Sequence, residues 1–168
     1  MSTTSTTLTS WALLIWKALQ SRGCDAHAIF KQVGLDTAKL GDGNARYRLS
    51  DMRDLWEASI EETDDPCFGF EVGQLWTPTT FHALGFAWLA SHTLKDALTR
   101  LARYTRIVNN SLSANLEAKG AYLQLTMDTY EDDQYMHYAG RDAGMVSILK
   151  MCRLLCGENF APVEIQVT

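Results

Sequence analysis

The sequence predicts an α+β fold that is predominantly helical and carries a small antiparallel sheet. Two observations predict this class. Apolar residues recur every three or four positions through most of 10–108 and again up to residue 156, which indicates amphipathic helices. Over 112–127 the apolar period falls to two, which indicates a β-hairpin. The chain of 168 residues is long enough for one domain with a buried core.

The first two helices are predicted from their apolar stripes and capping residues. Residues 1–9 are rich in Ser and Thr, and we expect a flexible tail there. Thr9 or Ser10 is expected to cap the first helix. Asp25 is expected to cap a short second helix that ends at Gly34. The stripe of the first helix consists of Trp11, Leu14, Ile15, Ala18 and Leu19.

Four further helices are expected before the hairpin. Ser50 is the expected cap of the third, and Pro66 fits the first turn of a short fourth. Residues 81–90 are apolar nearly all round, which predicts a buried fifth helix. Thr93 and Asp96 fit a capping box that opens the sixth helix.

Alternation predicts a hairpin with one buried face, with its turn at Gly120. A long helix is then expected from about 132 to 156, ended by Gly157. The last residues, 161–168, are expected to form a C-terminal strand. Either this strand pairs with the hairpin in a three-stranded sheet, or the chain is cut inside a larger sheet.

The formal net charge of −5 makes the chain itself a poor candidate for gripping a nucleic-acid backbone. The apolar run 11–16 stops at Lys17 and follows no basic residue, so no export signal is expected. No stretch reaches the roughly 20 apolar residues of a membrane helix, so we expect no membrane partner and a cytoplasmic location. The four cysteines are too scattered for a disulfide framework.

Catalytic signatures are missing, so we expect no enzyme, no catalytic residue and no cofactor. Cys152 and Cys156 share a helix face and belong either to the core or, with further ligands, to a metal site; we expect no metal. Asp133, His137 and Arg141 form a column that is either a polar wall of a site or a solvated helix face.

Five residues are candidates for binding a small molecule. Trp56, His82, Trp88 and Tyr104 are rings with one polar atom on otherwise apolar helices, as in a pocket that orients a ligand. The alternative is a core in which each ring finds one hydrogen-bond partner. Arg103 lies in a row with Arg100 and Arg106, which either holds an anion or an acidic partner surface, or is a solvated face.

The sequence from 81 to 108, FHALGFAWLASHTLKDALTRLARYTRIV, closely resembles the arabinose-binding-like N-terminal domain of one branch of AraC/XylS-type transcription regulators. Arg46, the Leu55–Trp56 pair and an Asp-Pro…Gly…Gly element fit the same family in the same order. That element consists of Asp65, Pro66, Gly69 and Gly73. The residues of the central match are Gly85, Ala87, Trp88, Leu89, Ser91, Thr93, Leu94, Ala97, Leu98, Leu101 and Tyr104. Where the family often has Pro, this chain has Tyr47-Arg48.

The resemblance implies that 10–168 is an N-terminal sensory and dimerisation domain, and that this domain is truncated. It implies a small-molecule effector, a homodimer, and DNA binding only through a C-terminal helix-turn-helix domain that is not present in this chain. The competing hypotheses are a ligand-free dimerisation module, and a small haem or metal sensor or enzyme built on His82 or His137.

Overall fold

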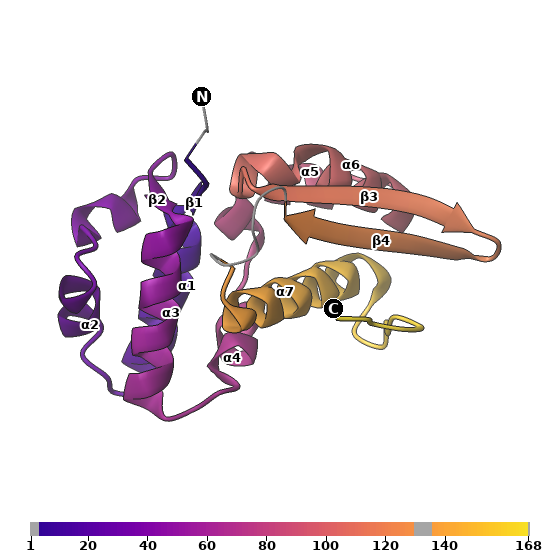
Figure 1. Cartoon of the computed structure of the whole chain (residues 1–168). Coiled ribbons are helices and arrows are strands. Elements are labelled where there is room, and N and C mark those ends of the chain that lie inside the picture. The colour runs from indigo at the N-terminus through magenta and orange to yellow at the C-terminus, as the bar shows by residue number, and fades with distance from the viewer. Residues whose placement is uncertain (1–3, 130–135, 168) are drawn as a thin grey trace.

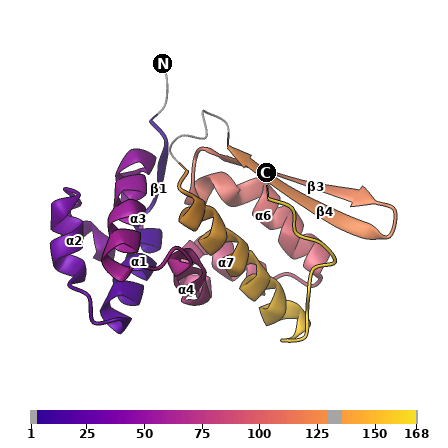
Figure 2. The same ribbon diagram turned by 60° about the horizontal axis from the view of Figure 1, so that its bottom comes forward.

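A computed structural model describes residues 4–129 and 136–167. Within these residues the structure contains α-helices, two short 3-10 helices (η) and two two-stranded antiparallel sheets, so the α+β prediction is confirmed. In chain order the elements are β1 Thr6–Leu8, α1 Thr9–Ser21, α2 Ala26–Gln32, η1 Thr37–Gly41, β2 Arg46–Arg48, α3 Leu49–Thr63, α4 Phe68–Gln74, η2 Pro78–Phe81, α5 Ala83–Leu89, α6 Leu94–Val108, β3 Leu112–Lys119, β4 Tyr122–Thr129 and α7 Tyr138–Cys156. Helices α1, α2 and α3 lie together on one side, the β3–β4 hairpin lies with α5 and α6 on the other, and α4 and α7 lie between them (Figure 1, Figure 2).

The N-terminal segment is built into the fold, so the expected flexible tail over 1–9 is wrong for the last part of that range. β1 pairs with β2, with Thr7 opposite Tyr47. Thr7 and Leu8 are buried. β1 runs straight into α1, and the backbone N–H of Thr9 donates to the Ala45 carbonyl oxygen (3.1 Å). Because a strand leads directly into α1, a backbone N–H at the start of the helix finds its hydrogen-bond acceptor in a neighbouring segment.

Two of the expected helix caps are wrong for the same reason. α1 begins at Thr9 with Leu8 at the cap position, so neither Thr9 nor Ser10 caps it. α3 begins at Leu49, directly after β2, so Ser50 lies inside the helix. Pro66 stands ahead of α4 rather than in its first turn.

The cap at Asp25 forms as predicted, and the described residues show one of the two hydrogen bonds of the capping box predicted at Thr93 and Asp96. The Asp25 carboxylate accepts from the Ala28 N–H (3.0 Å) at the start of α2. The Thr93 hydroxyl oxygen accepts from the Asp96 N–H (3.1 Å) at the start of α6.

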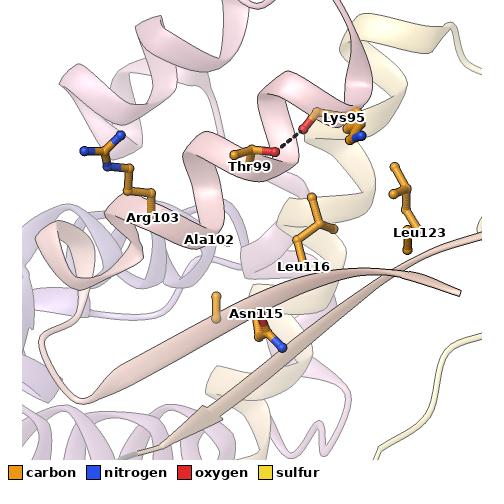
Figure 3. A pocket seen from close by; sticks show the side chains of 9 residues that line it. Lys95, Thr99, Ala102, Arg103, Asn115, Leu116 and Leu123 are labelled. Carbon is orange, nitrogen blue, oxygen red and sulfur yellow. Dashed lines mark hydrogen bonds between the residues drawn. The ribbon is translucent and has the colours of Figure 1, made fainter.

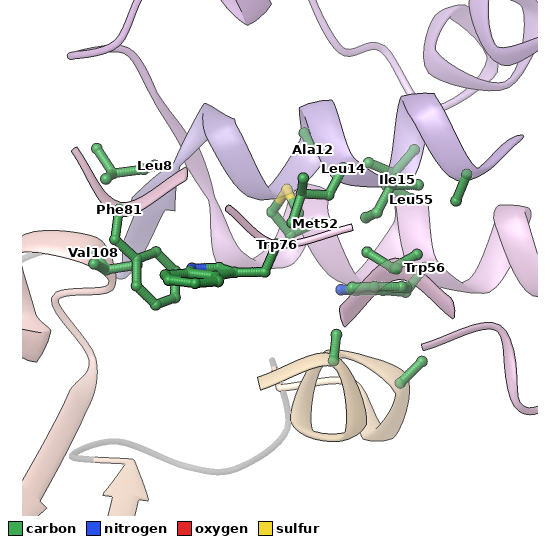
Figure 4. Close-up of a cluster of buried hydrophobic side chains, with 14 of the residues drawn as sticks. Leu8, Ala12, Leu14, Ile15, Met52, Leu55, Trp56, Trp76, Phe81 and Val108 are labelled. Carbon is green, nitrogen blue, oxygen red and sulfur yellow. The ribbon is translucent and has the colours of Figure 1, made fainter. Parts of the chain in front are cut away.

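Large apolar and aromatic side chains from both sides of the molecule form the core. Figure 4 shows Ile15 of α1 and Leu55 of α3 facing each other near Trp56, with Trp76 and Phe81 together at the other end of the cluster. The rings of Trp76 and Phe81 meet at 5.6 Å between centroids, and Phe81 in turn meets Trp11 at 5.6 Å. The stripe predicted for α1 is confirmed, with Leu14, Ile15, Ala18 and Leu19 all buried.

α4 and α7 cross at very short range because two glycines face the crossing. A Cβ added to Gly69 would lie 2.3 Å from the Ala139 carbonyl oxygen, and one added to Gly73 would lie 2.7 Å from that of Ala143. Real Cβ atoms do not approach so closely, so only glycine fits at these positions. The Ser147 hydroxyl also donates to the Ala143 carbonyl oxygen and lies 3.4 Å from the carbonyl oxygen of Gly73.

The Arg46 side chain ties β1 to the last turn of α6. Its Nε and Nη2 donate to the side-chain and backbone oxygens of Thr6 (2.8 and 3.0 Å). Its Nη1 and Nη2 donate to the carbonyl oxygens of Ile107 and Val108 (2.7 and 3.3 Å). Burial lowers the pKa of Arg46, but a guanidinium stays charged in proteins. A cation against the final carbonyls of a helix also complements the helix dipole.

The predicted hairpin is confirmed, and its turn contains Gly120 at φ +62°. Leu116 lies opposite Leu125, and Ala118 lies opposite Leu123. The predicted buried face is only partly covered. Leu116 and Leu125 are half-buried, and Leu123 is 40% exposed.

The expected C-terminal strand does not form. Within the described residues β3 and β4 pair only with each other, and residues 161–167 belong to no strand. Val163, Ile165 and Val167 are exposed. The alternation favours an extended backbone, but a strand also needs a neighbouring edge to supply its hydrogen bonds.

α5 and α7 also depart from expectation. α5 is not buried all round, because Phe86 and Leu89 are 57% and 43% exposed. α7 begins at Tyr138, and Asp133 of the predicted polar column lies outside the described residues. The predicted end of this helix is confirmed, with the Gly157 N–H donating to the Arg153 carbonyl oxygen (2.8 Å).

Candidate functional site

An open groove of about 480 Å³ separates α6 from the inner face of the β3–β4 hairpin (Figure 3). Its volume falls within the range of small-molecule sites. The lining residues are Lys95, Thr99, Ala102 and Arg103 of α6, Ala114, Asn115, Leu116 and Ala118 of β3, and Leu123 of β4.

Small side chains account for the space. Ala102 on α6 faces Ala114 and Ala118 on β3 across the groove, where larger side chains would close it. Leu116 and Leu123 extend from the hairpin toward α6 (Figure 3). The hairpin therefore rests on α6 without filling the interface, which leaves an apolar surface open to solvent.

Two cations stand at opposite ends of this apolar surface. Lys95 and Arg103 are eight residues apart on α6, which is about 12 Å along a helix axis. Neither forms an ion pair with another residue in the described parts of the chain. The Arg103 guanidinium rests over the Tyr104 ring, 5.4 Å from its centroid.

The carboxylate of Glu117 on the hairpin is ion-paired and points away from the groove. Glu117 forms an ion pair with Lys119 (2.7 Å), and the Asn115 amide donates to it (2.9 Å). These two hydrogen bonds, that of Lys119 above all, lower the pKa of the Glu117 carboxyl. Successive side chains of a strand point to opposite faces, so Glu117 points away from the face that carries Leu116 and Ala118.

Of the five ligand-binding candidates, only Arg103 lines the groove. Trp56 is buried against Phe68, with 6.4 Å between ring centroids. Trp88 is fully buried, and its Nε1 donates to the Met151 carbonyl oxygen (2.9 Å). Trp88 thus matches the core alternative, a ring with one hydrogen-bond partner.

The other two candidates lie elsewhere. Tyr104 is 40% exposed on α6, outside the lining of the groove. His82 joins η2 to α5 with backbone angles of φ 47° and ψ −124°, which are unusual for a residue with a side chain. Its imidazole lies against Gly43, and its buried Nε2 has no hydrogen-bond partner among the described residues.

The histidines and cysteines do not gather into a metal site within 4–129 and 136–167. His137 caps α7, its Nδ1 accepting from the Ala139 N–H (3.2 Å), and burial is the main cause that lowers its pKa. Cys152 is buried, which raises the pKa of its thiol to about 11, whereas Cys156 is exposed.

Sequence reasoning missed most of the groove, including Lys95, Thr99 and the leucines of the hairpin. A signal was present. An amphipathic helix leads directly into a hairpin, and the positions that face each other include Ala102, Ala114 and Ala118. Facing alanines leave unfilled space only where the two backbones stay apart, so this signal alone would not have been sufficient.

No helix in the described part of the chain is both long and apolar enough to cross a membrane. The groove combines an apolar surface with a few charged groups, as sites for small molecules commonly do. Comparison with known families agrees: the sequence pattern of the arabinose-binding domain of AraC transcription regulators, an N-terminal domain, matches residues 23–168. The chain therefore belongs to this family, and the resemblance given above is confirmed. No curated protein matched the chain.

Proposed function

We propose that this chain is the ligand-sensing and dimerisation domain of a bacterial AraC-type regulator, and that its effector binds in the groove between α6 and the hairpin. The groove itself carries the proposal, because it combines a suitable volume, an apolar surface and charged groups within a ligand-binding family. The proposal includes a cytoplasmic location, no catalytic role, and DNA binding through a C-terminal domain outside this chain.

An effector acts on such a domain only by binding one conformation better than another. α6 carries both the groove residues, such as Ala102, and an exposed apolar face that includes Tyr104 and Ile107. A ligand that fills the groove would alter the packing of the hairpin on α6. The same helix would then present its outer face differently to a partner.

The exposed face of α5 and α6 supports the homodimer. Phe86 and Leu89 on α5 and Tyr104 and Ile107 on α6 are 40–57% exposed, and the two helices pack against each other. Within each helix the two residues are three positions apart and therefore share a face. Exposed apolar residues that share a face mark association surfaces, and we propose a second copy of the chain as the occupant.

Thermal unfolding with a panel of amino acids, fatty acids and aromatic acids tests the sensing role. A bound compound raises the melting temperature of the folded domain. We expect Ala102→Leu, which occupies the groove, to abolish that rise. Ala28→Leu, at an exposed position of α2 outside the groove lining, is the matched control and should retain it. Loss of the rise in both variants, or no rise with any compound, would favour the ligand-free dimerisation module.

Sedimentation velocity tests the dimer. We expect the wild-type chain to sediment as a dimer and Phe86→Glu to sediment as a monomer. Tyr122→Glu, at an equally exposed aromatic position on the hairpin, should leave the dimer intact. If the wild-type chain stays monomeric at high concentration, the dimer proposal is refuted, while the proposal that the groove binds the effector is unaffected.

A further inference from the structure

We propose that the groove between α6 and the hairpin binds an organic anion with an apolar body, that is, a carboxylate attached to a hydrocarbon chain or ring. The inference rests on the proposed function, because it takes this groove as the effector site, and it adds the chemical class of the effector.

The first step is the charge of the lining. Its two charged residues are Lys95 and Arg103, and none of its members is Asp or Glu. The whole chain carries a net charge of −5, so a lining with only positive charges runs against the overall balance. A site of this kind attracts anions and disfavours cations.

The second step is the state of those two cations. Neither has a carboxylate partner among the described residues, and both side chains are exposed at the groove. The Arg103 guanidinium lies over the Tyr104 ring and is directed away from the hairpin, so its side chain has to turn toward the groove to meet a ligand (Figure 3). A guanidinium is suited to bidentate contact with a carboxylate, and an ammonium supplies a point charge.

The third step is the surface between them. Leu116 and Ala102 lie between Lys95 and Arg103, and Leu123 continues the apolar surface beyond Lys95 (Figure 3). The separation of about 12 Å along α6 leaves room for a hydrocarbon chain or a ring beside the charged group. A small inorganic anion would leave this apolar surface exposed to water, so an anion with an apolar body fits better.

Glu117, an acidic residue close to the groove, does not compensate the charges of Lys95 and Arg103. Glu117 is paired with Lys119 and lies on the other face of β3. The side chain of Asn115 is likewise engaged with Glu117. The positive charge of the groove is therefore left for a ligand.

Isothermal titration with octanoate and its uncharged counterpart octanamide, and with phenylacetate and phenylacetamide, tests the class. We expect at least one acid to bind at least tenfold more tightly than its amide. The double variant Lys95→Gln/Arg103→Gln should lose that preference at least tenfold. Lys17→Gln/Lys31→Gln removes two exposed charges from α1 and α2 and should bind as the wild type does. Ala102→Leu should block binding of the acid.

The possible failures are distinct. If acid and amide bind with equal affinity and Ala102→Leu blocks both, the anion inference is overturned while the groove stands as the effector site. If an acid binds with undiminished affinity to both the double variant and Ala102→Leu, it binds elsewhere and the inference is overturned. If none of these four compounds binds, but a neutral or cationic compound of the wider panel binds in an Ala102→Leu-sensitive manner, the proposed function holds and the inference fails. If no compound of either set binds, both fail.

Discussion

The α4–α7 crossing and the α6–hairpin interface solve the same packing problem in opposite ways. At the crossing, Gly69 and Gly73 let two backbones approach to contact distance, so no space is left. At the hairpin, alanines also face one another, yet the backbones stay apart and a groove of about 480 Å³ remains. Small residues alone therefore do not decide whether an interface closes.

The difference lies in what each pair of elements can do. Two helices present curved surfaces that settle into each other when side chains are removed. A two-stranded hairpin on a helix is stiffened by its own ladder and contacts the helix along one apolar face only. Small residues therefore give direct backbone contact in the first case and an open groove in the second.

The largest expected effect is at the crossing. Gly69→Ala puts a methyl group against the Ala139 carbonyl oxygen, where no flexible side chain can give way. We expect a loss of about 3 kcal/mol in the free energy of unfolding, measured by urea denaturation. Gly144→Ala is the control, because its Cβ meets nothing within 4 Å on the same α7 helix. That variant should gain about 0.5–1 kcal/mol. Equal effects at the two sites would show that the crossing is not tight.

The free energy of unfolding should also decrease at alkaline pH, because of Tyr47 in β2. The Tyr47 hydroxyl donates to the Asp36 carbonyl oxygen (2.6 Å), and burial, with a smaller contribution from the Asp36 charge, raises the pKa of Tyr47 from 10.0 to about 12. Because the folded pKa is the higher one, this stabilisation is complete below pH 10 and is lost as pH rises to about 12. We expect a loss of about 1–2 kcal/mol across that interval. Tyr47→Phe should flatten the dependence, whereas an unchanged slope in that variant would contradict the assignment.

Truncation at the groove should cost much less than truncation in the core. Leu123→Ala removes a side chain that is 40% exposed, so we expect a loss of less than about 1 kcal/mol in chemical denaturation. Leu55→Ala removes a fully buried leucine and should cost about 3 kcal/mol. A comparable loss at both leucines would mean that the hairpin face is packed as firmly as the core.

The smallest effect is on thiol reactivity. Cys67 and Cys156 are exposed, while Cys152 is buried with a thiol pKa of about 11. We expect Cys67 and Cys156 to react first with a thiol reagent at neutral pH, and Cys152 to react only after unfolding. Mass spectrometry of partly labelled protein would identify the sites. Early labelling of Cys152 would indicate that α7 opens locally.

Local sequence signals predicted the helices and the hairpin well, because apolar periodicity is set by which face of each element is covered. The cap at Asp25 was predicted because it depends on residues three apart. The caps predicted at Ser10 and Ser50 do not form, because β1 and β2 run directly into α1 and α3. The prediction of a C-terminal strand was wrong for a related reason. Its pairing depends on a free sheet edge nearby, which the spacing of apolar residues does not reveal.

The candidate site was harder to predict than the fold. Nothing near Trp88 in the sequence shows that its N–H reaches the Met151 carbonyl oxygen, 63 residues away. The sequence alone could therefore not distinguish a buried tryptophan of the core from one that lines a pocket. Arg103 was singled out because arginines three apart mark one side of α6, and it lines the groove. Lys95 was missed because its relation to the hairpin depends on how β3 folds back over the helix.

Two hydrogen bonds of Arg46 reach back 40 residues to the first strand, and two reach forward 61 and 62 residues to the end of α6. A fluorophore or spin label attached just ahead of Thr6 would therefore sense disturbance of that distant helical turn, although it sits far from it along the chain. Deleting the opening strand should likewise fray the final carbonyls of α6, so the N-terminus is a poor place to trim when shorter versions of this domain are made.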